Sequence, residues 1–214
     1  MDAYEAKKLI VESGLKLVKE GLVSRTWGNI SCRIDDNFFA ITPSGRTYEE
    51  VTPEDVVIVN IHDLKHDGNI KPSSEKGMHA EAYKLRPDVT AVIHTHQMNA
   101  STVAAARCGI PDIKSPEAEI VGPDIRVAAY ALPGTKKLKM AAAGALEGRN
   151  AALLANHGAV CIGKDMDDAF LVAKTLEVVC RSFIENQFLE KHSQVKEFSI
   201  EAMHQVYLDK FSAR

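Results

Sequence analysis

Apolar and polar positions alternate along this chain with two different spacings. Between residues 3 and 20 the apolar residues recur every three or four positions, which predicts an amphipathic helix that ends near Gly21. Short apolar runs bounded by turn residues predict strands at 27–34, 37–42, 56–61, 91–96 and 125–130. Renewed helical spacing predicts helices that run from 72–75 to about residue 85, and at 98–108, 134–146 and 166–190.

The stretch 151–162 is apolar over most of its length, and we expect one buried strand that continues through 156–158. Strand pairs near the start of the chain favour antiparallel pairing over pure β-α-β alternation, so the pattern predicts a mixed α and β fold. No repeat, low-complexity tract or linker divides the sequence, and a single domain over 1–214 is the simplest organisation. The residues after 191 are weakly patterned.

The composition is that of an ordinary globular protein. Of the 214 residues, 45% are hydrophobic and 26% are charged. The formal net charge of -3 lacks the basic excess that binding to a nucleic-acid backbone requires. No apolar run approaches the roughly 18 residues of a membrane span, and the first residues lack the apolar core of a secretory signal. We therefore expect a cytoplasmic protein without nucleic-acid or membrane partners.

The cysteines argue against two kinds of stabilised scaffold. They lie far apart in the sequence and never form a C-x-x-C pair, which argues against a disulfide framework and against a zinc ribbon. We expect all four to be small core residues, namely Cys32, Cys108, Cys161 and Cys180.

A possible metal site is indicated by His94-Thr95-His96. Residues two apart in a strand point to the same face, so both imidazoles would project into one site while Ile93 enters a core. With His157 and Glu75 they would form a ligand set suited to zinc or a similar first-row ion. The alternative is that each is structural, with Glu75 as a helix-capping carboxylate. The remaining histidines are assigned to solvent, namely His62, His66, His79, His192 and His204.

A possible anion site is indicated by three short segments, 26–29, 42–45 and 72–74. Each combines small hydroxyl or amide side chains with a Gly or Pro that shapes the backbone. A helix that starts at Ser73 and Ser74 would add free N–H groups and a positive dipole end, so the segments could hold a phosphate without Lys or Arg. The alternative is that each segment is simply a turn.

Taken in order, five motifs resemble the class II aldolase/adducin-head family over nearly the whole chain, to about residue 190. They are GNIS (28–31), TPSG (42–45), PSSE (72–75), HTH (94–96) and NHG (156–158). The resemblance implies an α/β fold, a three-layer α/β/α sandwich around a mostly antiparallel central sheet. It also implies a homotetramer with active sites between neighbouring subunits.

The resemblance also implies roles for individual residues. His94, His96 and His157 would hold one divalent ion per subunit, usually Zn²⁺, although Mn²⁺ or Co²⁺ could serve. Glu75 would both approach the ion and act as the catalytic base. The segments that bind the substrate phosphate in the family match Gly28, Asn29, Ser44, Gly45, Ser73 and Ser74.

The implied activity is reversible cleavage of a ketose 1-phosphate into dihydroxyacetone phosphate and a short aldehyde. Glu75 and the chain length resemble the branch that cleaves L-fuculose 1-phosphate to lactaldehyde, whereas the 26–29 loop resembles the epimerase branch. The fuculose branch also has two tyrosines that this chain does not match: none is present around 114–116, and Tyr207 does not align cleanly with the one near the C-terminus. Open alternatives are a 5-deoxypentulose 1-phosphate aldolase, an L-ribulose-5-phosphate 4-epimerase, a sugar-phosphate dehydratase and a non-catalytic scaffold. Retention of all four expected ligands disfavours the scaffold.

Overall fold

The computed structural model describes residues 1–23, 26–191, 199, 201 and 205. Within them the strands form one seven-stranded sheet in the order β3-β2-β1-β4-β7-β6-β5. Every neighbouring pair is antiparallel except β5 with β6, so the central sheet is mostly antiparallel, as predicted. The strands are β1 (Asn29–Arg33), β2 (Phe38–Ile41), β3 (Val57–Asn60), β4 (Ala91–Thr95), β5 (Val127–Ala128), β6 (Ala151–Leu154) and β7 (Gly158–Gly163).

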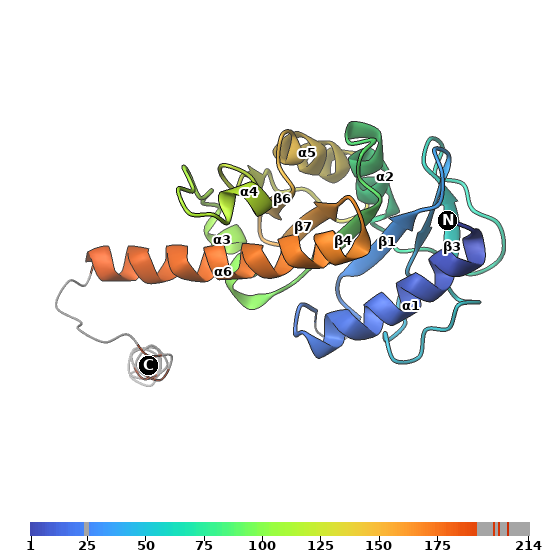
Figure 1. Cartoon of the computed structure of the whole chain (residues 1–214), viewed down its shortest axis with the longest axis horizontal. Helices are drawn as coiled ribbons and strands as arrows, with labels where there is room; N and C mark the ends of the chain where they lie inside the picture. The colour runs from blue at the N-terminus through green and yellow to red at the C-terminus, as the bar shows by residue number, and fades with distance from the viewer. Residues whose placement is uncertain (24–25, 192–198, 200, 202–204, 206–214) are drawn as a thin grey trace.

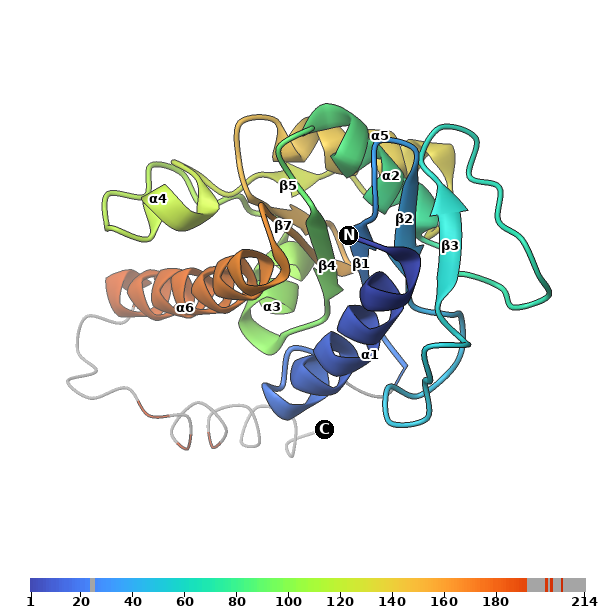
Figure 2. The ribbon, with the colours of Figure 1, turned by 45° about the vertical axis from the view of Figure 1, so that its right-hand side comes forward.

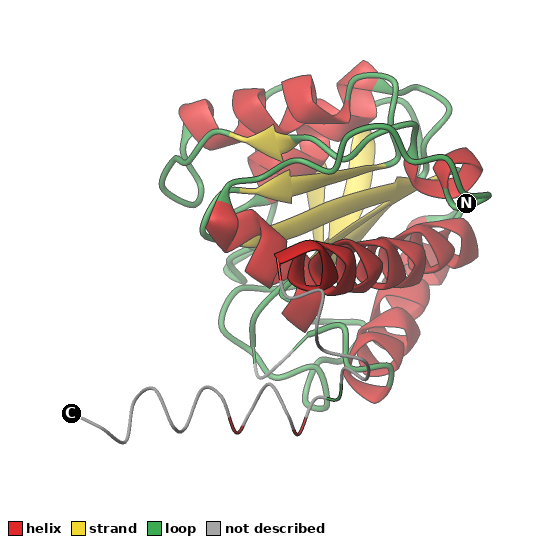
Figure 3. Cartoon of the chain, turned by 90° about the vertical axis from the view of Figure 1, so that its left-hand side faces the viewer, coloured by secondary structure: helices red, strands yellow, loops and turns green. Residues whose placement is uncertain are grey.

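Helices cover both faces of the sheet, which confirms the predicted three-layer α/β/α sandwich (Figures 1, 2 and 3). One face carries α1 (Ala3–Lys19), α3 (Met98–Ala106), α4 (Ala118–Val121) and α6 (Met166–Lys191). The other carries α2 (Lys76–Leu85) and α5 (Lys136–Leu146). No helix of the described residues is long and apolar enough to cross a membrane.

Two hydrophobic cores lie on opposite sides of the sheet because side chains along each strand alternate between its faces. In β4, Ile93 packs into the core under α1, α3 and α6, whereas Val92 packs into the core under α2 and α5. Because both faces are buried, β4, β6 and β7 are mostly apolar and show no alternating pattern. Strand β1 differs, because the polar Asn29 and Ser31 alternate with the apolar Ile30 and Cys32.

One predicted element is wrong, because residues 151–162 do not form a single strand. The chain turns between β6 and β7, which pair antiparallel with Leu154 opposite Gly158. Asn156 takes a φ of 57° in this turn, a left-handed conformation that asparagine tolerates better than most residues. Because the residues on both sides of the turn are apolar, hydrophobic periodicity does not reveal where the chain reverses. The reversal places His157 in the turn.

Smaller differences concern element ends and single residues. Helix α2 begins at Lys76, and Glu75 occupies its N-cap position without a side-chain capping bond, so the carboxylate is free for another role. Cys108 is exposed, contrary to the expectation of a core residue, whereas the other three cysteines are buried as expected. His192, His204, Tyr207 and most of the tail lie outside the described residues.

Candidate metal centre

The antiparallel order of the central strands gathers the candidate residues at one end of the sheet. Strand β4 ends beside His96 at the same end at which β1 and β7 begin, and Asn29 lies opposite His94 in the ladder. The turn before β7 supplies His157, and the segment before α2 supplies Glu75. Residues that are up to 128 positions apart in sequence, from Asn29 to His157, therefore share one site.

Three histidine side chains meet at this end of the sheet. One ligand atom from each of His94, His96 and His157 lies within 4.8 Å of the others, and the group could hold a metal ion. Their rings lie edge to face, with centroid separations of 4.7, 4.7 and 5.2 Å. His94 is fully buried, while the other two are partly exposed, so the group opens to one side.

Hydrogen bonding sets the form of His94. Its Nδ1 donates to the carbonyl oxygen of Ala159 at 2.8 Å, so in the neutral ring Nε2 carries the lone pair that faces the site. That Nε2 lies 2.9 Å from Nε2 of His96. Burial, with the neighbouring histidines, lowers the pKa of His94 and of His96 to about 3. Neutral imidazole is the form that binds metals, and these donors fit such an ion.

The Glu75 carboxylate lies against two of the three rings. Its Oε2 is 3.2 Å from Nε2 of His94, and its Oε1 is 3.5 Å from Nε2 of His157. Among the described residues, Oε1 of Glu75 and Nδ1 of His157 are buried without a hydrogen-bond partner. A buried polar atom without a partner is costly, so an unpaired carboxylate oxygen beside three imidazoles suits a site that a cation and a substrate would complete.

A cavity of about 190 Å³ opens beside Glu75, His96 and His157. All six residues expected at the phosphate line it, namely Gly28, Asn29, Ser44, Gly45, Ser73 and Ser74. Thr26, Trp27 and Pro43 line it too, and the Trp27 ring lies tilted against His96 with ring centroids 5.9 Å apart. No Lys or Arg of the described chain contributes to the lining.

The two serine loops are bonded to each other. Ser44 N–H donates to the carbonyl of Lys71, and Ser73 N–H donates to the carbonyl of Thr42. These two amides are therefore committed to the protein, while the Ser73 hydroxyl accepts from Glu75 N–H at 3.2 Å and still has its own proton to donate. The amides of Ser44 and Ser73 therefore already donate within the protein, and a ligand in the cavity would have to be bound by other donors.

Two glycines allow the close approach of backbone to the histidines. A Cβ on Gly158 would lie 2.3 Å from the carbonyl oxygen of Thr95, and one on Gly28 would lie 2.7 Å from that of His94. Gly28 also has a φ of 81°. No side chain fits at either position without moving the strand that carries His94.

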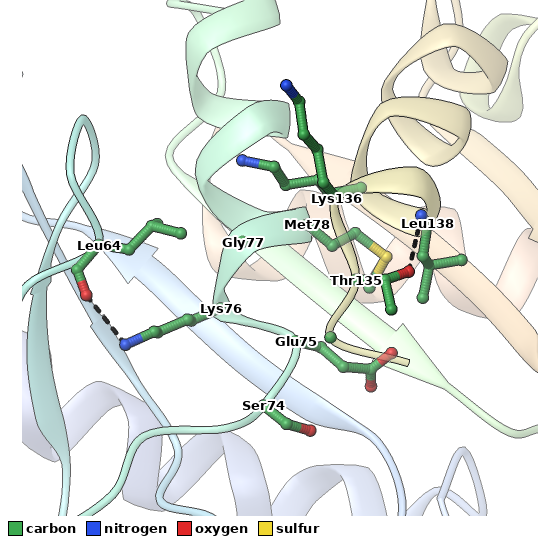
Figure 4. Close-up of a pocket in the computed structure, with 11 residues that line it drawn as sticks. Leu64, Ser74, Glu75, Lys76, Gly77, Met78, Thr135, Lys136 and Leu138 are labelled. Atoms are coloured by element: carbon green, nitrogen blue, oxygen red, sulfur yellow. Dashed lines mark hydrogen bonds between the residues drawn. The ribbon is translucent and has the colours of Figure 1, made fainter. Parts of the chain in front are cut away.

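The lysine nearest to Glu75 in sequence points away from the site. Figure 4 shows the start of α2, where Lys76 extends toward Leu64 while the Glu75 carboxylate points in another direction. The Lys76 ammonium donates to the carbonyl of Leu64 at 2.9 Å. It is therefore not placed to form a covalent adduct with a ligand beside the histidines.

The assignment of His79 to solvent is wrong. His79 is completely buried, with Nε2 2.5 Å from Oδ1 of Asn29. His62 is exposed as expected, and His66 is half-buried. The sequence does contain a signal for His79, because it lies four residues after Glu75 and therefore on the same face of α2. A reading of single histidines by local polarity overlooks that signal.

Comparisons with known proteins agree with this geometry. The family model described as Class II Aldolase and Adducin N-terminal domain matches residues 8–184. A 5-deoxy-D-ribulose 1-phosphate aldolase of Bacillus thuringiensis serovar kurstaki is 37% identical over 90% of both chains. An L-fuculose phosphate aldolase of Escherichia coli K12 is 33% identical over 86% of this chain and 85% of its own. A solved structure of an L-fuculose 1-phosphate aldolase superposes with a TM-score of 0.79 at 33% identity, over 97% of this chain and 96% of its own.

Proposed function

Because this chain belongs to the Class II Aldolase and Adducin N-terminal domain family, we propose that it is a metal-dependent aldolase acting on a ketose 1-phosphate. Its products would be dihydroxyacetone phosphate and a short aldehyde. The observation that carries the proposal is the meeting of three histidine nitrogens within 4.8 Å, beside a Glu75 oxygen that has no hydrogen-bond partner among the described residues.

In this proposal His94, His96 and His157 hold the divalent ion, with Glu75 at its edge. The donor set of imidazoles and one carboxylate favours zinc, and manganese or cobalt could replace it. When bound, the ion supplies Lewis acidity to the substrate oxygens and stabilises the negative charge that develops on carbon–carbon cleavage. The carbonyl of Ala159 accepts a hydrogen bond from Nδ1–H of His94 and so fixes the orientation of the ring. The Nε2 lone pair of His94 would then be directed toward the ion.

Glu75 would handle the proton on the carbon that is joined to the aldehyde. In condensation, Oε1 takes a proton from the hydroxymethyl carbon of dihydroxyacetone phosphate, and in cleavage it returns that proton to the same carbon. This oxygen suits the role because Oε2 already accepts from Asn29 Nδ2 at 2.9 Å, whereas Oε1 does not accept a hydrogen bond from any described residue.

The phosphate would lie in the cavity between the 28–29, 44–45 and 73–74 segments. Its binding there needs only hydroxyl and N–H donors and the positive end of α2. Binding of the phosphate, which lies away from the reacting carbons, would orient those carbons relative to Glu75.

Two substrates follow from the relatives. We propose 5-deoxyribulose 1-phosphate first, because the relative named for it is 37% identical over 90% of both chains. L-fuculose 1-phosphate, the expectation from sequence, comes second. Cleavage of both releases dihydroxyacetone phosphate, whereas the aldehyde is acetaldehyde from the first and lactaldehyde from the second. A homotetramer with shared active sites and a cytoplasmic location remain predictions.

The test is release of dihydroxyacetone phosphate from each ketose 1-phosphate, with L-ribulose 5-phosphate as a third compound. Each assay is run on the protein as purified, after chelation, and after zinc is returned. We expect release that chelation abolishes and zinc restores, with the greater kcat/KM for 5-deoxyribulose 1-phosphate. No release from either 1-phosphate by zinc-loaded protein would reject the aldolase and leave the epimerase or dehydratase alternative.

A further inference from the structure

Five buried polar side chains form a continuous chain between α2 and β1. Tyr83 Oη lies 2.7 Å from Ser31 Oγ, which lies 2.6 Å from His79 Nδ1. His79 Nε2 lies 2.5 Å from Asn29 Oδ1, and Asn29 Nδ2 donates to Glu75 Oε2 at 2.9 Å. All five residues are at most 7% exposed.

The spacing of these residues explains why they meet. Glu75, His79 and Tyr83 are four residues apart and therefore lie along one face of α2. Asn29 and Ser31 are two residues apart in β1 and point to the same face of the sheet. The helix packs on that face, so a polar row on the helix lies against a polar row on the strand.

The direction of every hydrogen bond in this series of five side chains follows from Glu75, the residue at its end. As a base, the Glu75 carboxylate can only accept, so Asn29 must present its amide nitrogen to Glu75 and its oxygen to His79. His79 Nε2 must then carry the proton. Burial, with a smaller contribution from the nearby His94, lowers the pKa of His79 to about 3, so its ring is neutral and Nδ1 accepts from Ser31. Ser31 in turn accepts from Tyr83.

This order has a consequence at Glu75. An asparagine amide could turn either end to the carboxylate, and its oxygen would repel Oε2. The Nε2–H of His79 favours the productive orientation because it needs the Asn29 oxygen as its acceptor. The same contacts occupy both ends of the Asn29 side chain, so one amide N–H is what this side chain retains for a ligand in the cavity.

We propose that His79 is a positioning residue for the reaction: through Asn29 it holds Oε2 of Glu75 in place and leaves Oε1 free to exchange a proton with substrate. The proposal rests on the proposed function, in which Glu75 is the base. His79 does not line the cavity and does not contact substrate, so its effect would be on the geometry of proton transfer, not on binding.

Two substitutions distinguish the roles of the two ring nitrogens of His79. In His79→Gln the amide nitrogen reaches the place of Nε2 and keeps a donor for Asn29. In His79→Asn the side chain ends near the place of Nδ1 and loses that donor. We expect His79→Asn to lower kcat by about 10²-fold, with KM and bound zinc nearly unchanged, because small displacements of a catalytic group have effects of this size. His79→Gln should recover most of that loss, and exposed His62→Asn should match the wild type.

Nitrogen NMR of the zinc-loaded wild type, with labelled histidine, supplies a readout that does not depend on activity. The His79 resonances, assigned by their loss in His79→Gln, should show a neutral ring protonated at Nε2. Protonation at Nδ1 instead, or equal kcat in the two variants, would overturn the positioning role while leaving an active aldolase. A zinc-loaded wild type that releases no dihydroxyacetone phosphate would remove the proposed function, and the catalytic role of His79 with it.

Discussion

Glu75 presents two oxygen atoms in different surroundings. Oε2 accepts from Asn29 and lies 3.2 Å from His94, whereas Oε1 lies 3.5 Å from His157 with no hydrogen bond to the described chain. A folded protein gains nothing in stability from a buried carboxylate oxygen that lacks a partner. The asymmetry therefore favours a role in binding or catalysis over a purely structural one.

Exchange of Glu75 for glutamine should separate chemistry from metal binding. Glu75→Gln keeps the shape and the three histidines but removes the base, so turnover should fall by about 10²- to 10⁴-fold while zinc content stays nearly complete. His94→Ala is the contrasting variant and should lose zinc and activity together. Zinc per subunit and the rate of dihydroxyacetone phosphate release test both. Unchanged turnover in Glu75→Gln would exclude this residue as the base.

Patterns within a single segment were the better guide to the histidines of the site. Contacts between different segments could not be predicted in the same way. His94 and His96 share a face because a strand has a period of two, which the sequence shows directly. His79 was misplaced because its partners, Asn29 and Ser31, lie on another strand, and only the packing of α2 on β1 brings them together. The helical period from Glu75 was readable, but it does not say which face is buried.

At the scale of elements, the hairpin of β6 and β7 is the feature that periodicity could not reveal. Both strands are buried on both faces, so each is an apolar run, and the turn between them includes the apolar Ala155. Apart from the short α4, which the sequence analysis does not predict, the helix ends and the other central strands lie within a few residues of their predicted places, because Gly, Pro and polar residues mark them. The turn matters for function because it is the element that delivers His157 to the other two histidines.

Gly158 in this hairpin should tolerate a side chain poorly. The Cβ of Gly158→Ala would lie 2.3 Å from the carbonyl oxygen of Thr95, so β7 must move away from β4. We expect a loss of roughly 1–3 kcal/mol in the free energy of unfolding, as for overpacked cores, together with lower turnover. Urea unfolding and the release assay measure the two effects.

The matched control is Gly144→Ala in helix α5, where an added Cβ meets no atom within 4 Å. Alanine is favoured over glycine inside a helix, so this variant should gain about 0.5–1 kcal/mol and keep its activity. Equal stability of Gly158→Ala and the wild type would contradict the close approach of the two strands at Thr95.

At the scale of the whole molecule, the site exists because the sheet is antiparallel. The five sequence motifs are scattered from residue 28 to residue 158, and alternate strand directions bring the start of β1 and β7 to the end of β2 and β4. Motif order could predict the layers and the family. It could not predict which loops bond to each other, such as the pairing of 42–44 with 71–73, because those contacts depend on strand register.

Buried histidines couple this architecture to pH. His79 and His94 are completely buried, and the pKa of each is lowered from 6.5 to about 3, mainly by burial. Above the unfolded value neither state binds a proton at these rings. Between that value and about 3, the unfolded chain binds protons that the folded chain does not, so the free energy of unfolding falls as the pH falls.

Chelated wild type should therefore lose stability on acidification, and His79→Gln should lose less of it. Each such ring contributes about 1.4 kcal/mol per pH unit below its unfolded pKa, so between about pH 7.5 and pH 5 the variant should retain roughly 2 kcal/mol that the wild type loses. Carboxylates titrate alike in both proteins and cancel in the difference. Urea unfolding of both proteins at the two pH values measures it, with His62→Gln as the exposed control that should follow the wild type. Equal losses in wild type and His79→Gln would show that His79 takes up its proton in the folded state, and would contradict its burial as a neutral donor.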